Sequence, residues 1–168
     1  MADDPGVRAR RALRAAMEAR DHAAVVALLA PDIVVRSPII GMSRFRGREA
    51  VSDLYAAIIE GFADYRYVAE LEGDGWQQLM FEGTLRGKHM QGVDMLRVDD
   101  SGLITEMTVM FRPLSGLIGF LVVIGPLIAK RRGRGHALVM RLVNGPLPLV
   151  ATLVERLGPR LINIGGGR

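Results

Sequence analysis

Apolar side chains recur every three or four positions in three parts of the N-terminal region, which is the spacing of helices with one buried face. These parts are residues 7–20, residues 22–30 and a segment that begins at Arg48. Asp21 is placed to cap the second helix, and Pro31 is placed to end it. Between the second and third helices the pattern predicts a short strand at residues 33–35 and a loop at residues 41–47.

After Ala63 the side chains alternate between two faces, which is the two-residue rhythm of β-strands. Turn-forming residues divide this part of the chain, most clearly the Asp-Asp-Ser-Gly sequence at residues 99–102. The predicted strands are residues 65–71, 76–85, 89–98 and 103–112. Three helices followed by a four-stranded meander indicate an α+β fold in which the sheet wraps against the helices.

The alternation also assigns the strand residues to a face of the sheet. The inward set comprises Leu79, Phe81, Gly83, Met90, Gly92, Asp94, Leu96, Met107, Val109 and Phe111. Gly83 and Gly92 are expected to leave room inside for a ligand. The outward set includes Met80, Val93, Met95 and Met110. Because such an apolar stripe on a solvated sheet is unusual unless it is covered, we expect a homodimer through this face, or a C-terminal segment folded over it.

Asp94 is the inward position that carries reactive chemistry. Burial among apolar side chains disfavours the carboxylate and raises its pKa, which makes Asp94 a candidate general acid. Two other interpretations stay open: a structural carboxylate held by backbone donors, and an ion pair with Arg36, which would lower that pKa. His22, His89 and His136 lack metal-ligand spacing, and we expect neither a metal nor a cofactor.

Composition separates the chain into two parts. Its 168 residues are enough for one core, and we divide them into a domain at residues 1–113 and an apolar, basic helical extension at residues 114–168. The chain has no cysteine, which excludes disulfides and thiolate chemistry. It opens with acids and a proline rather than a secretory signal, so we expect a cytoplasmic location.

The extension combines an uncharged run with a surplus of basic residues. Residues 113–129 carry no charge over 17 positions, but their Gly and Pro residues predict a broken helix rather than a membrane span. We expect two or three helices in residues 114–160 that lie across a pocket mouth or on a membrane interface. Lys130 and seven Arg stand against one acid, Glu155, which favours an anionic membrane surface or a partner over nucleic acid. The alternative is that these charges only keep an apolar segment soluble.

Three segments carry a resemblance to a known family. Residues 46–51, 92–104 and 111–115 resemble the SnoaL-like and ketosteroid-isomerase-like branch of the nuclear transport factor 2 (NTF2-like) superfamily, and the likeness covers about residues 8–115. The resemblance implies a cone-shaped α+β barrel around one apolar pocket. It places Asp94 where ketosteroid isomerases keep a protonated Asp that donates to the substrate oxyanion. It places Ser37 where they carry a general base, and Leu13 near their oxyanion Tyr, so two of the three working groups are replaced.

Two functions follow as hypotheses from these observations. The first is binding of a small apolar molecule in the pocket by a cofactor-free isomerase, cyclase or hydrolase with Asp94 as the acid. The second is a non-catalytic module that binds a lipid-like ligand and associates peripherally with membranes through its basic tail. Whether the protein is an enzyme is left open by the sequence. The predicted substrate-binding residues are Arg36, Ser37, Tyr55, Leu79, Phe81, Met90, Met107, Val109 and Phe111.

Overall fold

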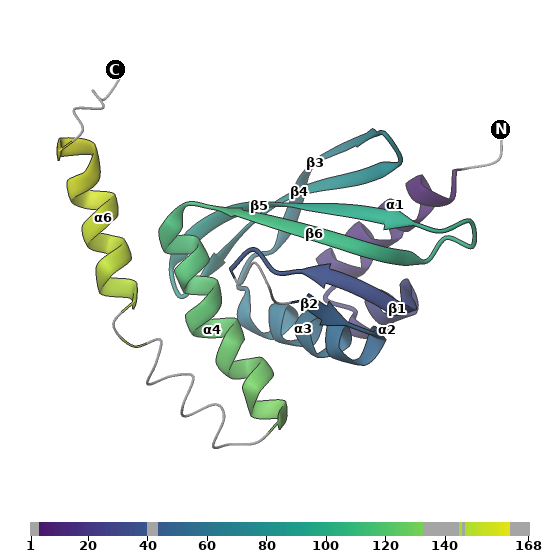
Figure 1. Ribbon diagram of the computed structural model, residues 1–168, viewed down its shortest axis with the longest axis horizontal. Coiled ribbons are helices and arrows are strands. Elements are labelled where there is room, and N and C mark those ends of the chain that lie inside the picture. Colours follow the sequence, from purple (N-terminus) through teal and green to yellow (C-terminus); the bar gives the residue numbers. More distant parts are fainter. Residues whose placement is uncertain (1–3, 40–43, 133–144, 146, 162–168) are drawn as a thin grey trace.

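A computed structural model describes residues 4–39, 44–132, 145 and 147–161 of the chain. The elements are α1 (Pro5–Glu18), α2 (His22–Ala27), β1 (Leu29–Arg36), β2 (Arg44–Arg46), α3 (Arg48–Gly61), β3 (Arg66–Gly73), β4 (Trp76–Leu85), β5 (Lys88–Val98), β6 (Ile104–Arg112), α4 (Leu114–Arg132) and α6 (Leu147–Leu161). Figure 1 shows one curved sheet with α1, α2 and α3 against it, while α4 and α6 follow the last strand. The α+β class is therefore confirmed.

The sheet has six strands in the order β2-β1-β6-β5-β4-β3. Strands β3 to β6 form the predicted antiparallel meander. β1 joins it by pairing in parallel with β6, and β2 adds an antiparallel edge. The sheet curves but stays open, so the expected barrel is not closed. The prediction of a loop at residues 41–47 missed β2, because its partner β1 is not visible in the local sequence pattern.

Local sequence signals position the first helices. The Asp21 side chain accepts a hydrogen bond from the backbone N–H of Ala24 at 3.0 Å, which confirms the predicted cap of α2. α2 ends at Ala27, earlier than expected, because the chain enters β1 at Leu29 and pairs there with Ile104. Pro31 lies inside β1 where the β1–β6 register shifts, a place that tolerates a missing backbone N–H.

The concave face of the sheet and the helices enclose the core. Leu79, Phe81, Met90, Leu96 and Met107 are at most 2% exposed, as the strand register predicted. Helix α1 packs against β3, β4 and β5, and α3 packs against β1 and β2. Apolar burial on this face is the main contribution to the stability of the domain.

Strand β3 departs from the predicted alternation. Its pairing with β4 shifts between Tyr67 and Ala69, and the shift reverses the face of every later side chain. Leu71 is consequently 63% exposed, whereas Glu70 turns toward α1. There Glu70 accepts hydrogen bonds from Arg10 at 3.0 Å and from Arg14 at 2.7 Å. The bulge thus replaces an apolar contact with ion pairs that join α1 to the sheet edge.

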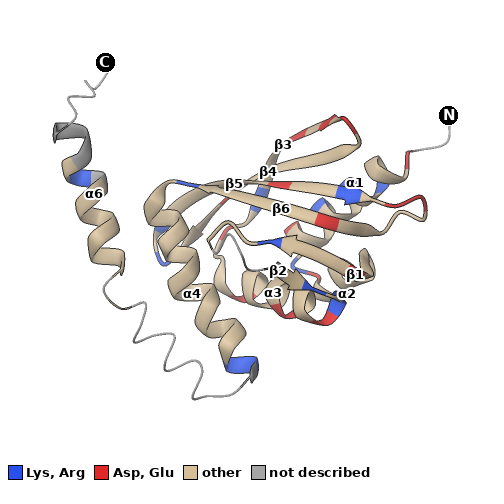
Figure 2. Cartoon of the chain, viewed as in Figure 1, with Lys and Arg blue, Asp and Glu red and all other residues tan. Residues whose placement is uncertain are grey.

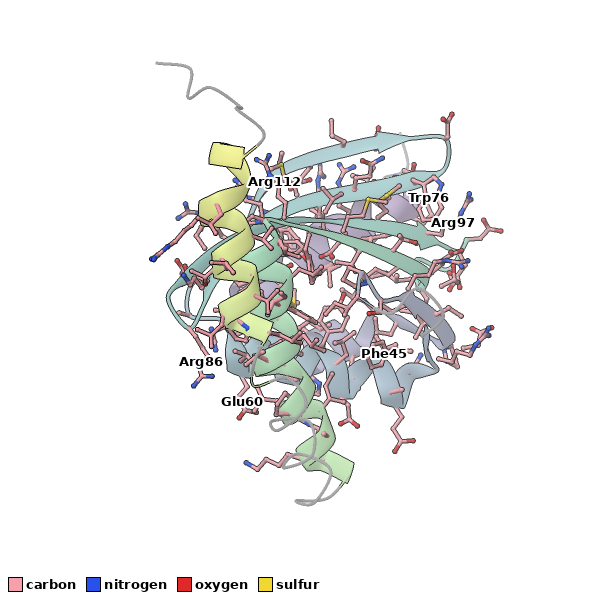
Figure 3. The ribbon with its side chains drawn as sticks, turned by 60° about the vertical axis from the view of Figure 1, so that its left-hand side comes forward. Phe45, Glu60, Trp76, Arg86, Arg97 and Arg112 are labelled. Carbon is pink, nitrogen blue, oxygen red and sulfur yellow. The ribbon has the colours of Figure 1, made fainter. Side chains whose placement is uncertain are left out.

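The outer face of the sheet carries the predicted apolar stripe. Met110 is 58% exposed, and Met80, Val93 and Met95 are half-buried. At one end of this face the Arg97 guanidinium lies 4.3 Å from the centre of the Trp76 ring (Figure 3). The extension does not cover this stripe with its described residues, because α4 contacts Met90 on the inner face.

Helix α4 is continuous over 19 residues and includes Pro126. The expectation that Gly and Pro would break it is wrong. Its packing explains the difference: Ile124 is fully buried against α3, where a Cβ on Gly61 would lie 2.6 Å from the Ile124 Cδ1 atom. Close contact with α3 therefore supports the helix where propensity alone would not. By length and composition, α4 is the one described helix long and apolar enough to cross a membrane.

The second half of the extension is partly described. α6 packs against α4, so two of the two or three helices predicted for residues 114–160 are present among the described residues. Residues 133–144, 146 and 162–168, which include His136, lie outside the described residues.

Candidate functional site

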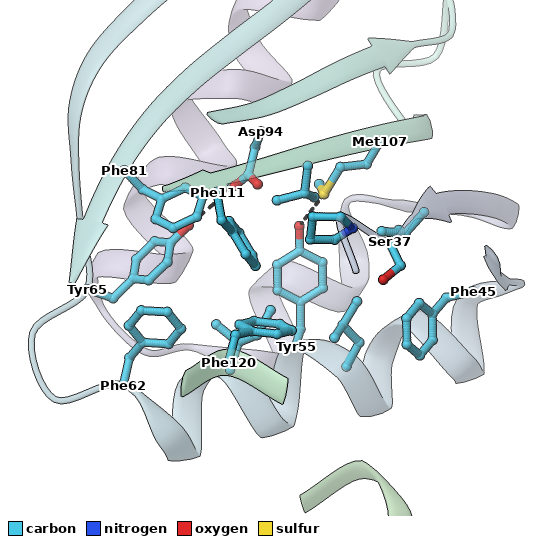
Figure 4. A pocket seen from close by; sticks show the side chains of 15 residues that line it. Ser37, Phe45, Tyr55, Phe62, Tyr65, Phe81, Asp94, Met107, Phe111 and Phe120 are labelled. Atoms are coloured by element: carbon cyan, nitrogen blue, oxygen red, sulfur yellow. Dashed lines mark hydrogen bonds between the residues drawn. The ribbon is translucent and has the colours of Figure 1, made fainter. Parts of the chain in front are cut away.

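A cavity lies between the inner face of the sheet and helix α3, and α4 closes one side of it (Figure 4). Its free volume is about 40 Å³, so the lining side chains have to move apart before a small-molecule ligand fits. The lining residues are Val35, Ser37, Pro38, Phe45, Leu54, Tyr55, Ile58, Phe62, Tyr65, Phe81, Asp94, Met107, Val109, Phe111 and Phe120. Apart from Asp94, Ser37 and the tyrosine hydroxyls, this lining is apolar.

Most of the residues predicted to bind substrate lie at this cavity. The structure brings together Ser37, Tyr55, Phe81, Asp94, Met107, Val109 and Phe111. Leu79 and Met90 also face inward, but they are fully buried in the core and do not line the cavity. A role in ligand binding stays a prediction for the residues that line the cavity. For Leu79 and Met90 the prediction is corrected, because they belong to the core.

Arg36 lies outside the site. Its Nε donates to the Glu106 carboxylate at 2.7 Å, so it neither lines the cavity nor pairs with Asp94. Consecutive strand residues point to opposite faces of the sheet. Because Val35 and Ser37 point to the inner face, Arg36 between them points to the outer face. The assignment of both Arg36 and Ser37 to the site was inconsistent with that alternation.

The expected space at the two inward glycines is filled. A Cβ on Gly92 would lie 2.3 Å from the Phe81 ring, and one on Gly83 would lie 2.6 Å from the Phe62 ring. Both rings line the cavity. These glycines therefore let aromatic side chains approach the backbone instead of leaving room for a ligand.

Asp94 sits on β5 between Leu79 of β4 and Val109 of β6, and it is 5% exposed. The Tyr67 hydroxyl donates to its Oδ2 at 2.9 Å, and the Tyr65 hydroxyl donates to the same oxygen at 3.3 Å. Among the described residues, Oδ1 has no hydrogen-bond partner. The carboxyl group is thus held by one oxygen, while the other remains for a ligand in the cavity.

The electrostatics of the site follow from burial. Burial raises the pKa of Asp94 to about 6, and the hydrogen bonds from Tyr67 and Tyr65 limit the rise because they favour the carboxylate. Burial, reinforced by the charge of Asp94, raises the pKa of Tyr55, Tyr65 and Tyr67 well above 10. The hydroxyls therefore stay protonated, and Asp94 is the group in this cluster that changes charge near neutral pH.

Aromatic rings surround this polar cluster. Tyr65 stacks on Phe81 with ring centroids 5.0 Å apart. Phe111 packs against Phe120 of α4, with ring centroids 4.8 Å apart. The Tyr55 hydroxyl donates to the Met107 sulfur at 3.2 Å rather than to Asp94. The contact between Phe111 and Phe120 therefore joins α4 to the aromatic lining of the cavity.

Sequence reasoning missed Tyr65 and Tyr67 as partners of Asp94. One signal was available: positions 65 and 67 alternate in the predicted strand at residues 65–71, which puts both rings on one face, and a buried tyrosine hydroxyl needs a hydrogen-bond partner. Phe120 was also missed, because an unbroken apolar run does not show which side chain reaches the cavity. No group of three or more metal-ligating side chains lies together in the part of the chain that the structure describes.

Comparison with known proteins decides the family. The sequence matches the SnoaL-like domain over residues 9–107, more than half of the chain. The chain belongs to the SnoaL-like family. A search among curated proteins finds no significant match.

Solved structures place this SnoaL-like protein in the same branch that the sequence resembles. A steroid delta-isomerase from Pseudomonas aeruginosa is 27% identical, with a TM-score of 0.67 over 77% of this chain and 93% of that one. An NTF2-like protein of unknown function from Mesorhizobium loti is 21% identical, with a TM-score of 0.58 over 65% of this chain and 92% of that one. The predicted NTF2-like fold and SnoaL-like, ketosteroid-isomerase-like membership are confirmed.

Proposed function

We propose that this SnoaL-like protein binds a small apolar molecule that carries one carbonyl group, and that protonated Asp94 donates a hydrogen bond to that oxygen as the acid of a cofactor-free isomerase-type reaction. The observation that carries the proposal is the position of Asp94. Its Oδ2 accepts hydrogen bonds from the hydroxyls of Tyr65 and Tyr67, and its Oδ1 has no hydrogen-bond partner among the described residues. When Asp94 is protonated, the proton is best placed on Oδ1, because Oδ2 already accepts two hydrogen bonds.

The raised pKa suits this role. With a pKa of about 6, roughly one tenth of Asp94 is protonated at neutral pH, far more than for an ordinary Asp. The apolar lining supplies binding energy for the body of the ligand and keeps water away from the hydrogen bond. The likeness to a steroid delta-isomerase supports an isomerase-type reaction on a ring ketone.

A specific observation favours a second candidate, a non-catalytic binding module. Among the described residues, Asp94 is the one carboxylate in the cavity lining, and Ser37 stands where the resemblance places the general base of ketosteroid isomerases. While Asp94 donates to the carbonyl oxygen, the described lining holds no second carboxylate that could take a carbon-bound proton. Binding of a ketone without turnover is the outcome that this candidate predicts.

A pair of matched ligands tests the binding mode. 1-Tetralone has one carbonyl oxygen, and tetralin is the same ring system without it. We expect the ketone to bind more weakly as the pH rises through about 6, because the ionised carboxylate cannot donate, while tetralin binding stays constant. Equilibrium dialysis of both ligands across this pH range is the measurement.

Two variants complete this test. Asp94→Asn keeps a donor that does not titrate, so its ketone binding should become independent of pH. Asp99→Asn is the matched control, because the Asp99 carboxylate accepts hydrogen bonds in the turn at residues 99–102 and does not line the cavity. Ketone binding that is independent of pH in the unaltered protein would contradict the proposed donor. Ultraviolet detection of a conjugated product from a β,γ-unsaturated steroid ketone then separates the enzyme from the binding module.

A further inference from the structure

Helix α6 exposes apolar side chains along one side. Leu149, Val150, Leu153, Val154 and Leu157 are between 40% and 77% exposed. Their spacing of one, three or four positions places them in one stripe on the helix surface, which we call the α6 stripe. Ala151, by contrast, is 1% exposed where α6 packs on the rest of the protein. The side of α6 that faces solvent is therefore apolar, the reverse of an ordinary surface helix.

Basic residues accompany this apolar surface. Residues 114–168 contain eight Lys and Arg against one acid, Glu155. Lys130 at the end of α4 and Arg156 next to Leu157 are exposed, and Figure 2 shows basic residues at the end of α4 and within α6. Arg131 is instead engaged with Asp53 and Glu60 of α3, at 3.4 and 3.8 Å, and fixes the end of α4 to the domain.

We propose that α4 and α6 form a docking surface for an anionic lipid bilayer. The α6 stripe would insert at the level of the headgroups, where exposed leucine and valine leave water. Lys130 and Arg156 would lie near the lipid phosphates. This proposal concerns a surface outside the cavity and does not depend on the role of Asp94.

The structure argues against two other occupants. A bilayer-spanning α4 would have to leave its contacts with α3, where Ile124 is fully buried, and with the inner face of the sheet at Met90. A second copy of the chain would bring two segments together that each carry a surplus of seven positive charges, and these would repel. An anionic bilayer is complementary to both the apolar stripe and the positive charge.

Vesicle flotation with the full chain tests the docking surface. The vesicles contain phosphatidylcholine alone or with about 30% phosphatidylserine. We expect flotation with the anionic vesicles at about 0.05 M salt, and a loss of several-fold or more at about 0.5 M salt. Leu153→Asp should weaken binding about tenfold or more, because it places a charge in the inserted stripe. Arg156→Glu should weaken binding to anionic vesicles as well.

Leu71→Asp is the matched control, since Leu71 is 63% exposed on the outer sheet face, away from this surface. It should float like the unaltered protein, and circular dichroism should show that all three variants are folded. Absence of binding to anionic vesicles at low salt would overturn the proposal. So would equal loss in Leu71→Asp and Leu153→Asp, or flotation that resists high salt and carbonate, which indicates a span. Self-association that Leu153→Asp abolishes, without vesicle binding, would assign the stripe to a contact between copies.

Discussion

Asp94 is buried in an apolar cavity, yet two tyrosine hydroxyls stabilise its charged form. Burial alone would favour the neutral acid, while the hydrogen bonds of Tyr67 and Tyr65 favour the carboxylate. The balance leaves its pKa at about 6, so the group changes charge within a physiological pH range. The same residue can therefore donate a proton at mildly acidic pH and accept one at higher pH.

The raised pKa makes stability depend on pH in a defined direction. The pKa of Asp94 is about 6 in the folded protein and about 3.9 in an unfolded chain. Its contribution to stability is thus fully present below the unfolded pKa and is lost as the pH rises through about 6. A difference of about two units corresponds to about 3 kcal/mol.

Urea unfolding of the unaltered protein and Asp94→Asn measures this contribution. Subtracting the variant removes the effect of other carboxylates. We expect the free energy of unfolding of the unaltered protein, relative to the variant, to fall by about 2 kcal/mol between about pH 4 and pH 7.5. A difference that does not change with pH, or that grows in the opposite direction, would show that the pKa of Asp94 is not raised.

The tyrosine hydroxyls set the size of the shift. Tyr67→Phe removes the shorter hydrogen bond to Oδ2, so the pKa of Asp94 should rise further. Tyr65→Phe removes the longer bond and should raise the pKa less. Carboxyl carbon NMR across pH measures each value, with Tyr55→Phe as the control. Equal shifts in the control and in Tyr67→Phe would mean that the hydrogen bond has no specific effect.

At the scale of elements, close packing of strands β4, β5 and β6 shapes the cavity wall. Gly92 on β5 leaves the Phe81 ring in contact with the backbone, and Phe81 in turn stacks on Tyr65. The Phe81 ring, which supports Tyr65 beside Asp94, can therefore take its position only because Gly92 on the neighbouring strand has no side chain.

Gly92→Ala tests this packing. The new Cβ would lie 2.3 Å from the Phe81 ring and 2.7 Å from the backbone oxygen of Met110, which belongs to the paired strand β6. We expect a loss of about 1–3 kcal/mol in the free energy of unfolding. Gly73→Ala is the control, because no atom lies within 4 Å of its Cβ position. Urea unfolding should show a change below about 0.5 kcal/mol for this control. Similar losses in both variants would contradict the packing argument.

At the scale of the whole molecule, the outer sheet face is the second uncovered apolar surface. Met110 is 58% exposed there, next to the half-buried Met80, Val93 and Met95. The described part of the extension lies on other surfaces, so it does not explain the stripe. We therefore propose a homodimer through this face, in which the apolar side chains of two copies cover each other.

Sedimentation velocity of charged variants tests the dimer. Met110→Asp should convert a dimer into a monomer, because two buried carboxylates would face each other across the twofold axis. Leu149→Asp on α6 is the control and should leave the dimer intact. A monomer in the unaltered protein at every concentration would contradict the proposal. Dissociation by Leu149→Asp alone would place the contact on α6 instead.

Local sequence signals determined much of the fold. The cap at Asp21, the four strands of the meander and the inward register of β5 were all predictable, because hydrogen-bonding caps, turns and two-residue alternation act between neighbouring residues. Asp94 was found in the same way, since its burial follows from its register. The resemblance of residues 92–104 to one family then indicated the fold, which the comparisons confirm.

Tertiary structure alone decided the partners of these residues. β2 forms because β1 offers an edge, and the bulge after Tyr67 sends Leu71 outward while Tyr67 and Tyr65 reach Asp94. α4 stays helical through Pro126 because α3 packs against it. Each of these outcomes depends on contacts between segments far apart in the chain. A local sequence pattern cannot predict the free energy of these contacts, because they form only once the chain has folded.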